Sequence, residues 1–181
     1  MRNIIGWVLF LAFLVHTNAF CLLNSGTTAP EFAVVSGDDR HISLSHLKGT
    51  VITVFYETRD KETTERNREL KNELNRFYIS QPDSIRKHVS KLAIINCSAA
   101  FWPFKEIWKK NLVKNSIKEE MTIYGDWDGR FFEDYLIVKD ESNFIIIDKT
   151  GKVRYSKAGR VEKIDFSAIK QLLEKLVSEN S

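Results

Sequence analysis

The chain has 181 residues, a length that suits one domain with a hydrophobic core of its own. It carries 27 lysine and arginine residues against 24 aspartate and glutamate residues, a formal net charge of +3, with both signs interspersed. An excess this small, without a block of five basic residues, gives no reason to expect nucleic acid as a partner.

Residues 1–19 have the pattern of a signal peptide. Arg2 precedes an apolar run at residues 4–15, and Thr17-Asn18-Ala19 places small or polar residues before a cleavage site after Ala19. The run is shorter than the roughly 20 apolar residues of a transmembrane helix, so we expect no transmembrane span. We expect a periplasmic or secreted protein with 26 basic and 24 acidic residues, a net +2, once the leader and its Arg2 are removed.

Cysteine occurs at two positions, Cys21 and Cys97. Cys21 lies just past the leader, where a bacterial lipoprotein carries its acylated cysteine, although the bulky Phe20 before it disfavours lipidation. An exported protein meets oxidising conditions, so a bridge between the two cysteines is permitted, but their spacing does not demand one. Cys97 follows an apolar run at residues 92–95, which favours a buried position for its side chain.

The rest of the sequence alternates between strand and helix patterns. Strands are expected at residues 32–35, 42–44, 51–56, 91–96, 121–124, 144–147 and 153–156. Helices are expected at residues 61–78, 103–118, 131–136 and 165–177. Continuous apolarity at 51–56 is typical of a central strand that is covered on both faces. Gly37-Asp38-Asp39 and Asp148-Lys149-Thr150-Gly151 predict hairpin turns.

Two of the helices have a clear apolar face. Leu70, Leu74 and Phe77 recur at helical spacing in the first, and the last begins after Asp165, a preferred N-cap residue. Its apolar face consists of Phe166, Ile169, Leu173 and Leu176. Strands separated by helices, followed by a late hairpin, predict an α/β fold in which a mixed sheet has helices on both faces. We expect one domain over residues 26–177.

Several motifs, taken in order, resemble the peroxiredoxin and thiol-reductase branch of thioredoxin-fold proteins. They are Ala29-Pro30-Glu31-Phe32, Ser43-Leu44-Ser45, Leu47-Lys48-Gly49, the strand at 51–56 and the closing hairpin Asp148-Lys149-Thr150-Gly151-Lys152-Val153. Within that branch, Asp140-Glu141-Ser142-Asn143 and the hairpin strands after it resemble the YtfJ-type family of periplasmic proteins. The resemblance implies a thioredoxin-like scaffold, a signal peptide and the loss of paired active-site cysteines. It implies no settled activity.

The chain departs from the thiol-active members of this branch at three places. A reductase carries its cysteines around the start of the first long helix, where the helix dipole stabilises a thiolate, and these places fall on Asp60 and Thr63. A peroxiredoxin sets its cysteine behind proline and threonine in the same turn, and residues 56–64 contain neither proline nor cysteine. The proline that faces the active site in these families is replaced by Ser142.

Polar residues nevertheless gather where the thiols would lie, at the end of one strand and the start of a helix. Ligand crevices in open α/β sheets tend to lie beyond the carboxyl ends of strands. A ligand-binding interpretation uses Arg59 for an anion and Asp60 for orientation. The plainer interpretation, which we favour, is that Asp60 caps the helix while Arg59 is solvated. The candidate ligand-binding residues are Glu57, Arg59, Asp60, Thr63 and Ser142.

An aromatic cluster follows the strand that ends before Cys97. It could form a partner surface, for which the candidates are Phe101, Trp102 and Trp108, because clustered exposed aromatics often mark interfaces. The helical spacing of Phe104 and Trp108 suits core packing as well, and we favour the core.

No motif predicts a metal or a cofactor. The histidines at 41, 46 and 88 lack metal-ligand spacing, and Asp126, Asp128 and Gly129 predict a turn rather than a calcium loop.

From the scaffold without its thiols, we expect a binding or interaction protein without thiol redox activity, acting on an unknown protein or small molecule of the cell envelope. The alternative is a divergent thiol oxidoreductase or peroxiredoxin-like enzyme that uses Cys97. A reactive Cys97 would be exposed near a cation, whereas a structural Cys97 would be buried.

Overall fold

The computed structural model describes residues 22–58 and 61–179. The expectations for the leader, for Cys21 and its bridge, and for Arg59 and Asp60 lie outside the described residues. Within the described part of the chain, no helix has the length and apolarity needed to cross a membrane.

A mixed sheet forms the centre of the molecule, as the sequence predicts. Its strands are β1 (Ala33–Ser36), β2 (His41–Ser43), β3 (Val51–Glu57), β4 (Val89–Asn96), β5 (Ile123–Asp126), β6 (Ser142–Ile147) and β7 (Val153–Ala158). They lie in the order β2-β1-β5-β4-β3-β6-β7. The β3, β4 and β5 strands run parallel, and the outer pairs are antiparallel. All of the expected strands are present, with ends shifted by at most two residues.

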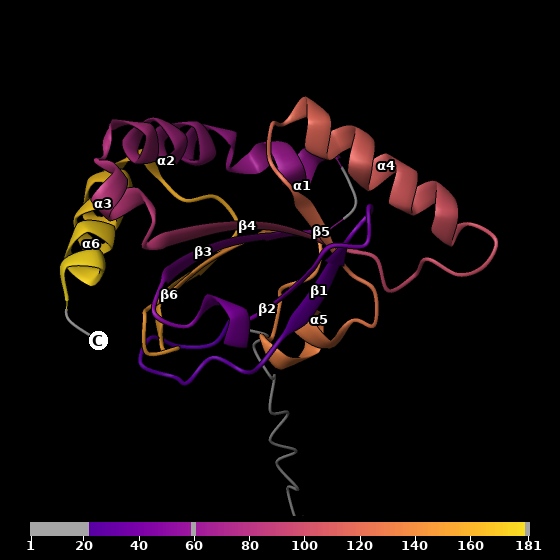
Figure 1. Ribbon diagram of the computed structural model, residues 1–181, viewed down its shortest axis with the longest axis horizontal. Coiled ribbons are helices and arrows are strands. Elements are labelled where there is room, and N and C mark those ends of the chain that lie inside the picture. Colours follow the sequence, from indigo (N-terminus) through magenta and orange to yellow (C-terminus); the bar gives the residue numbers. More distant parts are fainter. Residues whose placement is uncertain (1–21, 59–60, 180–181) are drawn as a thin grey trace, which may run out of the picture.

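Helices cover both faces of this sheet. They are α1 (Lys61–Arg66), α2 (Arg68–Ser80), α3 (Asp83–Arg86), α4 (Lys105–Lys118), α5 (Arg130–Asp134) and α6 (Phe166–Ser178). Two 3₁₀ turns are η1 (Ser45–Leu47) and η2 (Lys163–Asp165). In Figure 1, α1, α2 and α4 lie above the sheet, α5 lies below it, and α6 lies beside α2 at the left.

Alternating side chains of the central strands supply two cores, one on each face. The core under α2 and α6 contains Val51, Phe55, Leu70, Leu74, Phe144, Ile169, Leu173 and Leu176. The core against α5 contains Phe32, Ile52, Val54, Tyr56, Ile94, Phe131, Tyr135 and Ile145. Because β3 is buried on both faces, its sequence is apolar without alternation, as the pattern at 51–56 predicts.

The prediction of one long helix at 61–78 is wrong in one respect, because the helix is interrupted at Asn67, between α1 and α2. Asn67 has φ −108° and ψ 24°, outside the helical region, and its side chain is buried. Its amide Nδ2 donates to Ser142 Oγ at 3.0 Å and to the Gly159 carbonyl at 2.8 Å. Its Oδ1 accepts from the Val161 amide at 2.9 Å. Asparagine side chains compete with the helix for backbone partners, and here the competition ends the first helix.

One helix start and one helix cap also differ from the sequence prediction. The helix expected from Pro103 begins at Lys105. Asp165 does precede the last helix, but its side chain makes no capping hydrogen bond, because a 3₁₀ turn already leads into α6. Three of the four residues of the predicted apolar face, Ile169, Leu173 and Leu176, are buried, and Phe166 is partly buried.

Candidate functional site

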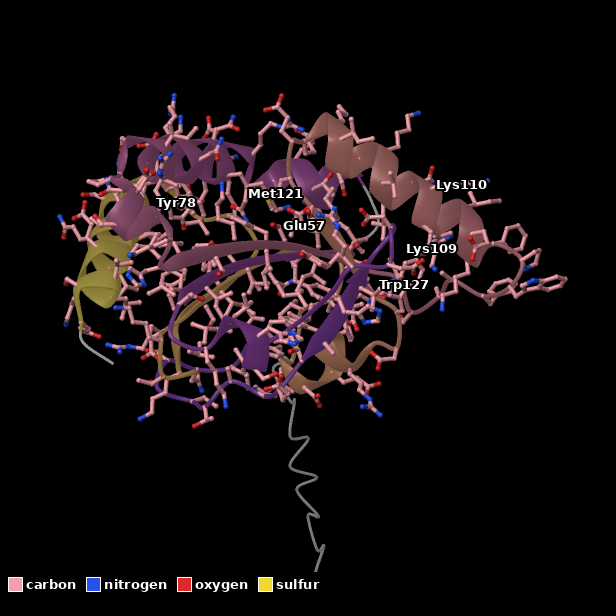
Figure 2. The ribbon with its side chains drawn as sticks, in the orientation of Figure 1. Glu57, Tyr78, Lys109, Lys110, Met121 and Trp127 are labelled. Atoms are coloured by element: carbon pink, nitrogen blue, oxygen red, sulfur yellow. The ribbon has the colours of Figure 1, made fainter. Side chains whose placement is uncertain are left out.

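The end of β3 meets the first residue of β6 and the start of α1. Glu57 is the last residue of β3 and pairs in register with Ser142, so two residues that the sequence separates by 85 positions lie side by side. In Figure 2, Glu57 lies between the end of the sheet and the helices above it. This is the place where the resemblance positions a thiol centre.

Glu57 is a buried carboxylate held by an ion pair. Its side chain is 7 % exposed, and its partner is Lys71 of α2, whose Nζ also donates to the Thr64 carbonyl at 3.0 Å. Ser142 Oγ donates to Glu57 Oε1 at 3.4 Å. Burial raises the pKa of Glu57 above its ordinary value, and the Lys71 ammonium and the Ser142 hydroxyl oppose that rise. The cluster therefore contains one buried acid with one cationic partner.

Thr63 closes the turn between β3 and α1. Its side chain is buried, and its Oγ1 donates to the Thr58 carbonyl at 3.2 Å and lies 3.3 Å from Thr58 Oγ1. These contacts tie the first turn of α1 to Thr58, the residue that follows β3. Thr63 therefore belongs to the frame of the candidate site.

The structure thus joins Glu57 to Ser142 by a hydrogen bond, and it buries Thr63 at the start of α1, where its hydroxyl binds Thr58. Among the described residues, no buried side-chain nitrogen or oxygen lacks a hydrogen-bond partner. All three side chains are buried. Ligand binding by the predicted set stays a prediction, since Arg59 and Asp60 lie outside the described residues.

Two residues that contact Ser142 and Glu57 are not among those expected from the sequence. Asn67 and Lys71 lie one helical turn apart, and each joins the helix pair to the sheet. Both are polar residues on the helix face that carries Leu70 and Leu74. A polar residue within an apolar stripe is the signal that would have indicated them.

Cys97 lies on a different element, directly after β4. It is 1 % exposed, its backbone amide donates to the Asp126 carbonyl at 3.0 Å, and its Sγ packs against Gly125. A methyl group on Gly125 would lie 3.0 Å from that sulfur, so the fit is close. The expected burial of Cys97 is confirmed.

A second buried polar pair lies near Cys97, on the opposite face of the sheet from α2. Tyr56 donates its hydroxyl to Asp126 Oδ2 at 2.8 Å, and Asp126 also accepts the backbone amide of Phe132 at 3.0 Å. Burial raises the pKa of Asp126, while these hydrogen bonds oppose the rise. Because Asp126 accepts hydrogen bonds from amides at the start of α5, it stabilises the turn at residues 126–129 that the sequence predicts before that helix.

Within the described residues, no group of three or more histidine, cysteine, aspartate or glutamate side chains could hold a metal ion.

No protein-family profile matches the chain, and no curated protein matches it. Solved structures do match. The exposed lipoprotein thioredoxin of Streptococcus pneumoniae strain TIGR4 is 18% identical, with a TM-score of 0.59 over 81% of this chain and 100% of that chain. The thioredoxin domain of a thiol-disulfide oxidoreductase from Bacteroides vulgatus is 18% identical, with a TM-score of 0.58 over 83% of this chain and 99% of that one. A thiol peroxidase from Chromobacterium violaceum is 16% identical, with a TM-score of 0.60 over 86% and 88%.

The fold is thioredoxin-like. At this level of identity the likeness establishes the fold alone. The turn between β3 and α1 is the place where the thioredoxin-fold resemblance positions the thiols, and its sequence, Thr58-Arg59-Asp60-Lys61-Glu62-Thr63, contains no cysteine.

The aromatic cluster lies outside the thioredoxin-like core. The interpretation of these residues as core is wrong for Phe101, Trp102 and Phe104, whose exposed fractions are 66%, 85% and 48%. They belong to the loop between β4 and α4, and Phe101 packs edge-on against Phe104 with ring centroids 5.3 Å apart. Helical spacing did not apply to them because α4 begins only at Lys105. Trp108, within α4, is partly buried.

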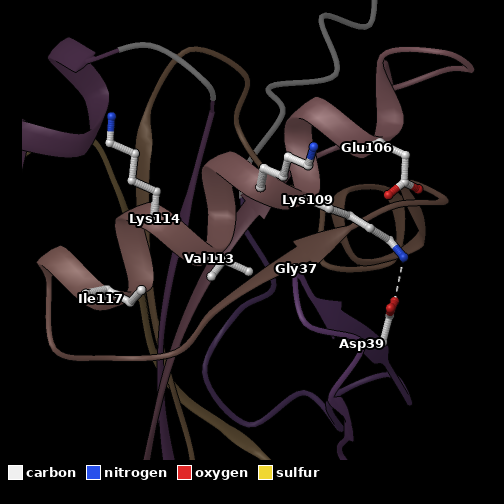
Figure 3. A pocket seen from close by; sticks show the side chains of 8 residues that line it. Gly37, Asp39, Glu106, Lys109, Val113, Lys114 and Ile117 are labelled. Atoms are coloured by element: carbon white, nitrogen blue, oxygen red, sulfur yellow. Dashed lines mark hydrogen bonds and ion pairs between the residues drawn. The ribbon is translucent and has the colours of Figure 1, made fainter.

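A shallow groove of about 440 Å³ runs between α4 and the turn that joins β1 to β2. Figure 3 shows Lys109 reaching across it to Asp39, at 2.6 Å, while Lys114 extends away at the other end. At Gly37 the turn and α4 approach so closely that a Cβ there would lie 2.2 Å from the Lys109 carbonyl oxygen. Its lining includes three lysines of α4, Lys109, Lys110 and Lys114, together with the acids Asp39 and Glu106.

Proposed function

We propose that this chain is an exported thioredoxin-fold protein that does not exchange thiols and acts by binding a component of the cell envelope. The YtfJ-type periplasmic family is the group it resembles in this respect. The resemblance aligns the thiol positions with Asp60 and Thr63, and neither a carboxylate nor a hydroxyl can attack a disulfide or a peroxide as a thiolate does.

The observation that carries the proposal is the burial of Cys97. Thiol exchange requires a thiolate that a disulfide sulfur can approach, so reactive cysteines lie in partly exposed sites. Cys97 is 1 % exposed and follows β4, the parallel neighbour of β3, so its sulfur is buried next to the strand that leads to the turn. Its role on this proposal is to fill space against Gly125.

The exposed aromatic loop supports a role in binding. A single exposed apolar residue needs no explanation, but Phe101, Trp102 and Phe104 stand together on one loop. Aromatic side chains concentrated at the surface are typical of contact sites. The leader pattern supports an extracytoplasmic location, and one structural neighbour is itself described as an exposed lipoprotein.

The second candidate function is a divergent thiol oxidoreductase or peroxiredoxin-like enzyme that uses Cys97. The fold of its structural neighbours, among them a thiol-disulfide oxidoreductase and a thiol peroxidase, favours it. This candidate requires local opening around Cys97, because a buried sulfur cannot reach a substrate.

Turnover assays separate the two functions. The exported protein and Cys97→Ser are compared for reduction of insulin disulfides and for consumption of hydrogen peroxide with dithiothreitol as thiol donor. We expect no turnover from either protein, and we expect Cys97 of the wild type to react with a chromogenic disulfide reagent only after unfolding. Turnover that is lost in Cys97→Ser would establish the second candidate. Turnover that persists would point to Cys21, which Cys21→Ser then tests.

A further inference from the structure

The loop after β4 forms an apolar tip that protrudes from the molecule. The exposed side chains of Phe101, Trp102 and Phe104 are joined by Ile107 in the first turn of α4, which is 53% exposed. In Figure 1 this loop is the right-hand extremity of the ribbon, at the far end from α6. Four large apolar side chains within seven residues are therefore presented to the surroundings on a projection.

Basic residues follow this tip along α4. The helix carries five lysines and one glutamate, a net charge of +4, whereas the entire chain has only +3. The positive charge of the protein is thus concentrated on one element. Two of the lysines have roles within the domain: Lys105 lies 5.3 Å from the centre of the Trp127 ring, and Lys109 pairs with Asp39 across the groove.

Lys118, the last residue of α4, lies 3.6 Å from Glu119, so Lys110 and Lys114 are the two lysines of the helix left for an external partner. Both are exposed residues of the groove, and in the described part of the chain neither forms an ion pair. They lie one helical turn apart, so they present ammonium groups along one side of α4. Figure 2 shows Lys109 and Lys110 on the half of α4 that is nearer the tip.

We propose that the apolar tip and the lysines of α4 form a docking surface for a bilayer that contains anionic phospholipids. This proposal deepens the proposed function and rests on it, since it names the envelope component that is bound. Tryptophan and phenylalanine insert at the boundary between headgroups and acyl chains, while lysines keep their ammonium groups at the phosphates. Apolar insertion and attraction to anionic lipid together set the strength of such peripheral binding.

The shape of the surface favours a bilayer over a protein partner. A stable protein interface buries about 800 Å² on each side and needs a complementary partner surface. The tip consists of four apolar side chains, three on the projecting loop and Ile107 on α4, far fewer than the roughly 20–30 residues that a stable interface uses on each side. A bilayer accepts such a tip because its surface adapts to the inserted side chains.

Vesicle partition tests the proposal. The exported protein is sedimented with vesicles of phosphatidylcholine alone and with vesicles to which phosphatidylglycerol has been added. We expect binding to the anionic vesicles that falls as salt is raised, since screening weakens attraction at the surface. Trp102→Ala should weaken partition by about tenfold through loss of inserted apolar area. Lys110→Glu combined with Lys114→Glu should weaken partition into anionic vesicles by at least about tenfold.

Two further variants serve as controls. Ile164→Ala removes an equally exposed apolar side chain, 87% exposed, from η2 and should leave partition unchanged. Trp102→Phe should keep partition but lose most of the blue shift of tryptophan fluorescence on vesicle addition. Because all variants share one N-terminus, any contribution of that segment is common to them. All substituted side chains are exposed, so circular dichroism and urea midpoints should match the wild type.

The outcomes separate this proposal from the proposed function. Failure to bind anionic vesicles, or partition that is the same in Trp102→Ala as in the wild type, would overturn the bilayer proposal. A protein that cross-links to the tip while vesicles do not bind would also overturn it and would leave a binding function in place. Thiol turnover dependent on Cys97 would instead overturn the proposed function without altering the partition result.

Discussion

Asn67 Nδ2 donates a hydrogen bond to Ser142 Oγ at 3.0 Å, joining the break between α1 and α2 to the first residue of β6. The same side chain also binds Gly159 and Val161, so one amide connects three segments that are distant in sequence. Ser142 in turn contacts Glu57. This chain of contacts gives a polar centre to the region where the thioredoxin-fold resemblance positions reactive thiols.

Replacing Asn67 should therefore destabilise the domain. Asn67→Ala removes three hydrogen bonds and leaves the buried Val161 amide without its acceptor, so we expect the free energy of unfolding to fall by about 2–4 kcal/mol. Asn67→Asp keeps an acceptor for the Val161 amide but loses both donated hydrogen bonds, so it tests the two donated bonds separately from the accepted one. Urea unfolding followed by circular dichroism measures both. A loss below about 0.5 kcal/mol for Asn67→Ala, as at surface sites, would contradict this role.

The architecture could be predicted from the sequence because it depends on local patterns. The strand at β3 is apolar throughout, since both faces are buried, and the last helix carries Ile169 and Leu173 on one face. The break at Asn67 could not be predicted in this way. Its cause is the position of Ser142, Gly159 and Val161, which only the folded chain brings near.

The candidate site was predictable in part. Register pairing of β3 with β6 brings Glu57 to Ser142, as the resemblance implied, but nothing local in the sequence pairs Glu57 with Lys71. The aromatic loop was misassigned because its spacing suits either a core or a surface. The choice between them depends on where α4 begins, which the position of Pro103 did not fix.

Processing of the leader is a prediction of the sequence alone. N-terminal sequencing of the protein from the envelope of its native host should begin close to Phe20, because the small residues at 17–19 suit cleavage after Ala19. Intact-mass measurement of the same sample would reveal an acyl group on Cys21. A mature protein that retains Met1 would contradict export by this route.

Close packing of α4 at Gly37 gives a prediction about the groove. In Gly37→Ala the new methyl group would lie 2.2 Å from the Lys109 carbonyl oxygen and 3.0 Å from Val113 Cγ2, so the helix must move. We expect a loss of about 1–3 kcal/mol in the free energy of unfolding, as for other overpacked sites.

The matched control for that substitution is Gly49→Ala. Gly49 has open space around it but φ 81°, so its variant measures backbone strain without a clash. Chemical unfolding compares the two, and the fluorescence of Trp127, which donates to the Val35 carbonyl beside Gly37, reports movement of α4. An unfolding free energy of Gly37→Ala equal to that of the wild type would show that α4 does not need the close approach.

The last prediction concerns the dependence of stability on pH. Burial raises the pKa of Glu57 in the folded state above its value in the unfolded chain, with Lys71 and Ser142 limiting the rise. Between these two values the folded protein binds more protons than the unfolded one, so this group makes stability fall as the pH increases through that interval. Glu57→Gln cannot ionise, and its amide remains within reach of Ser142. The wild type should therefore lose stability relative to Glu57→Gln as the pH rises from the ordinary range of a glutamate, about 4.3. The difference should become constant once Glu57 is fully ionised in the folded state.

Urea midpoints of both proteins across this pH range give the difference in stability directly. Glu174→Gln, at an exposed glutamate of α6, shows how much of that difference comes from net charge alone. A difference that instead moves in favour of the wild type with rising pH would mean that attraction to Lys71 outweighs burial, and that the pair stabilises the ionised form of Glu57.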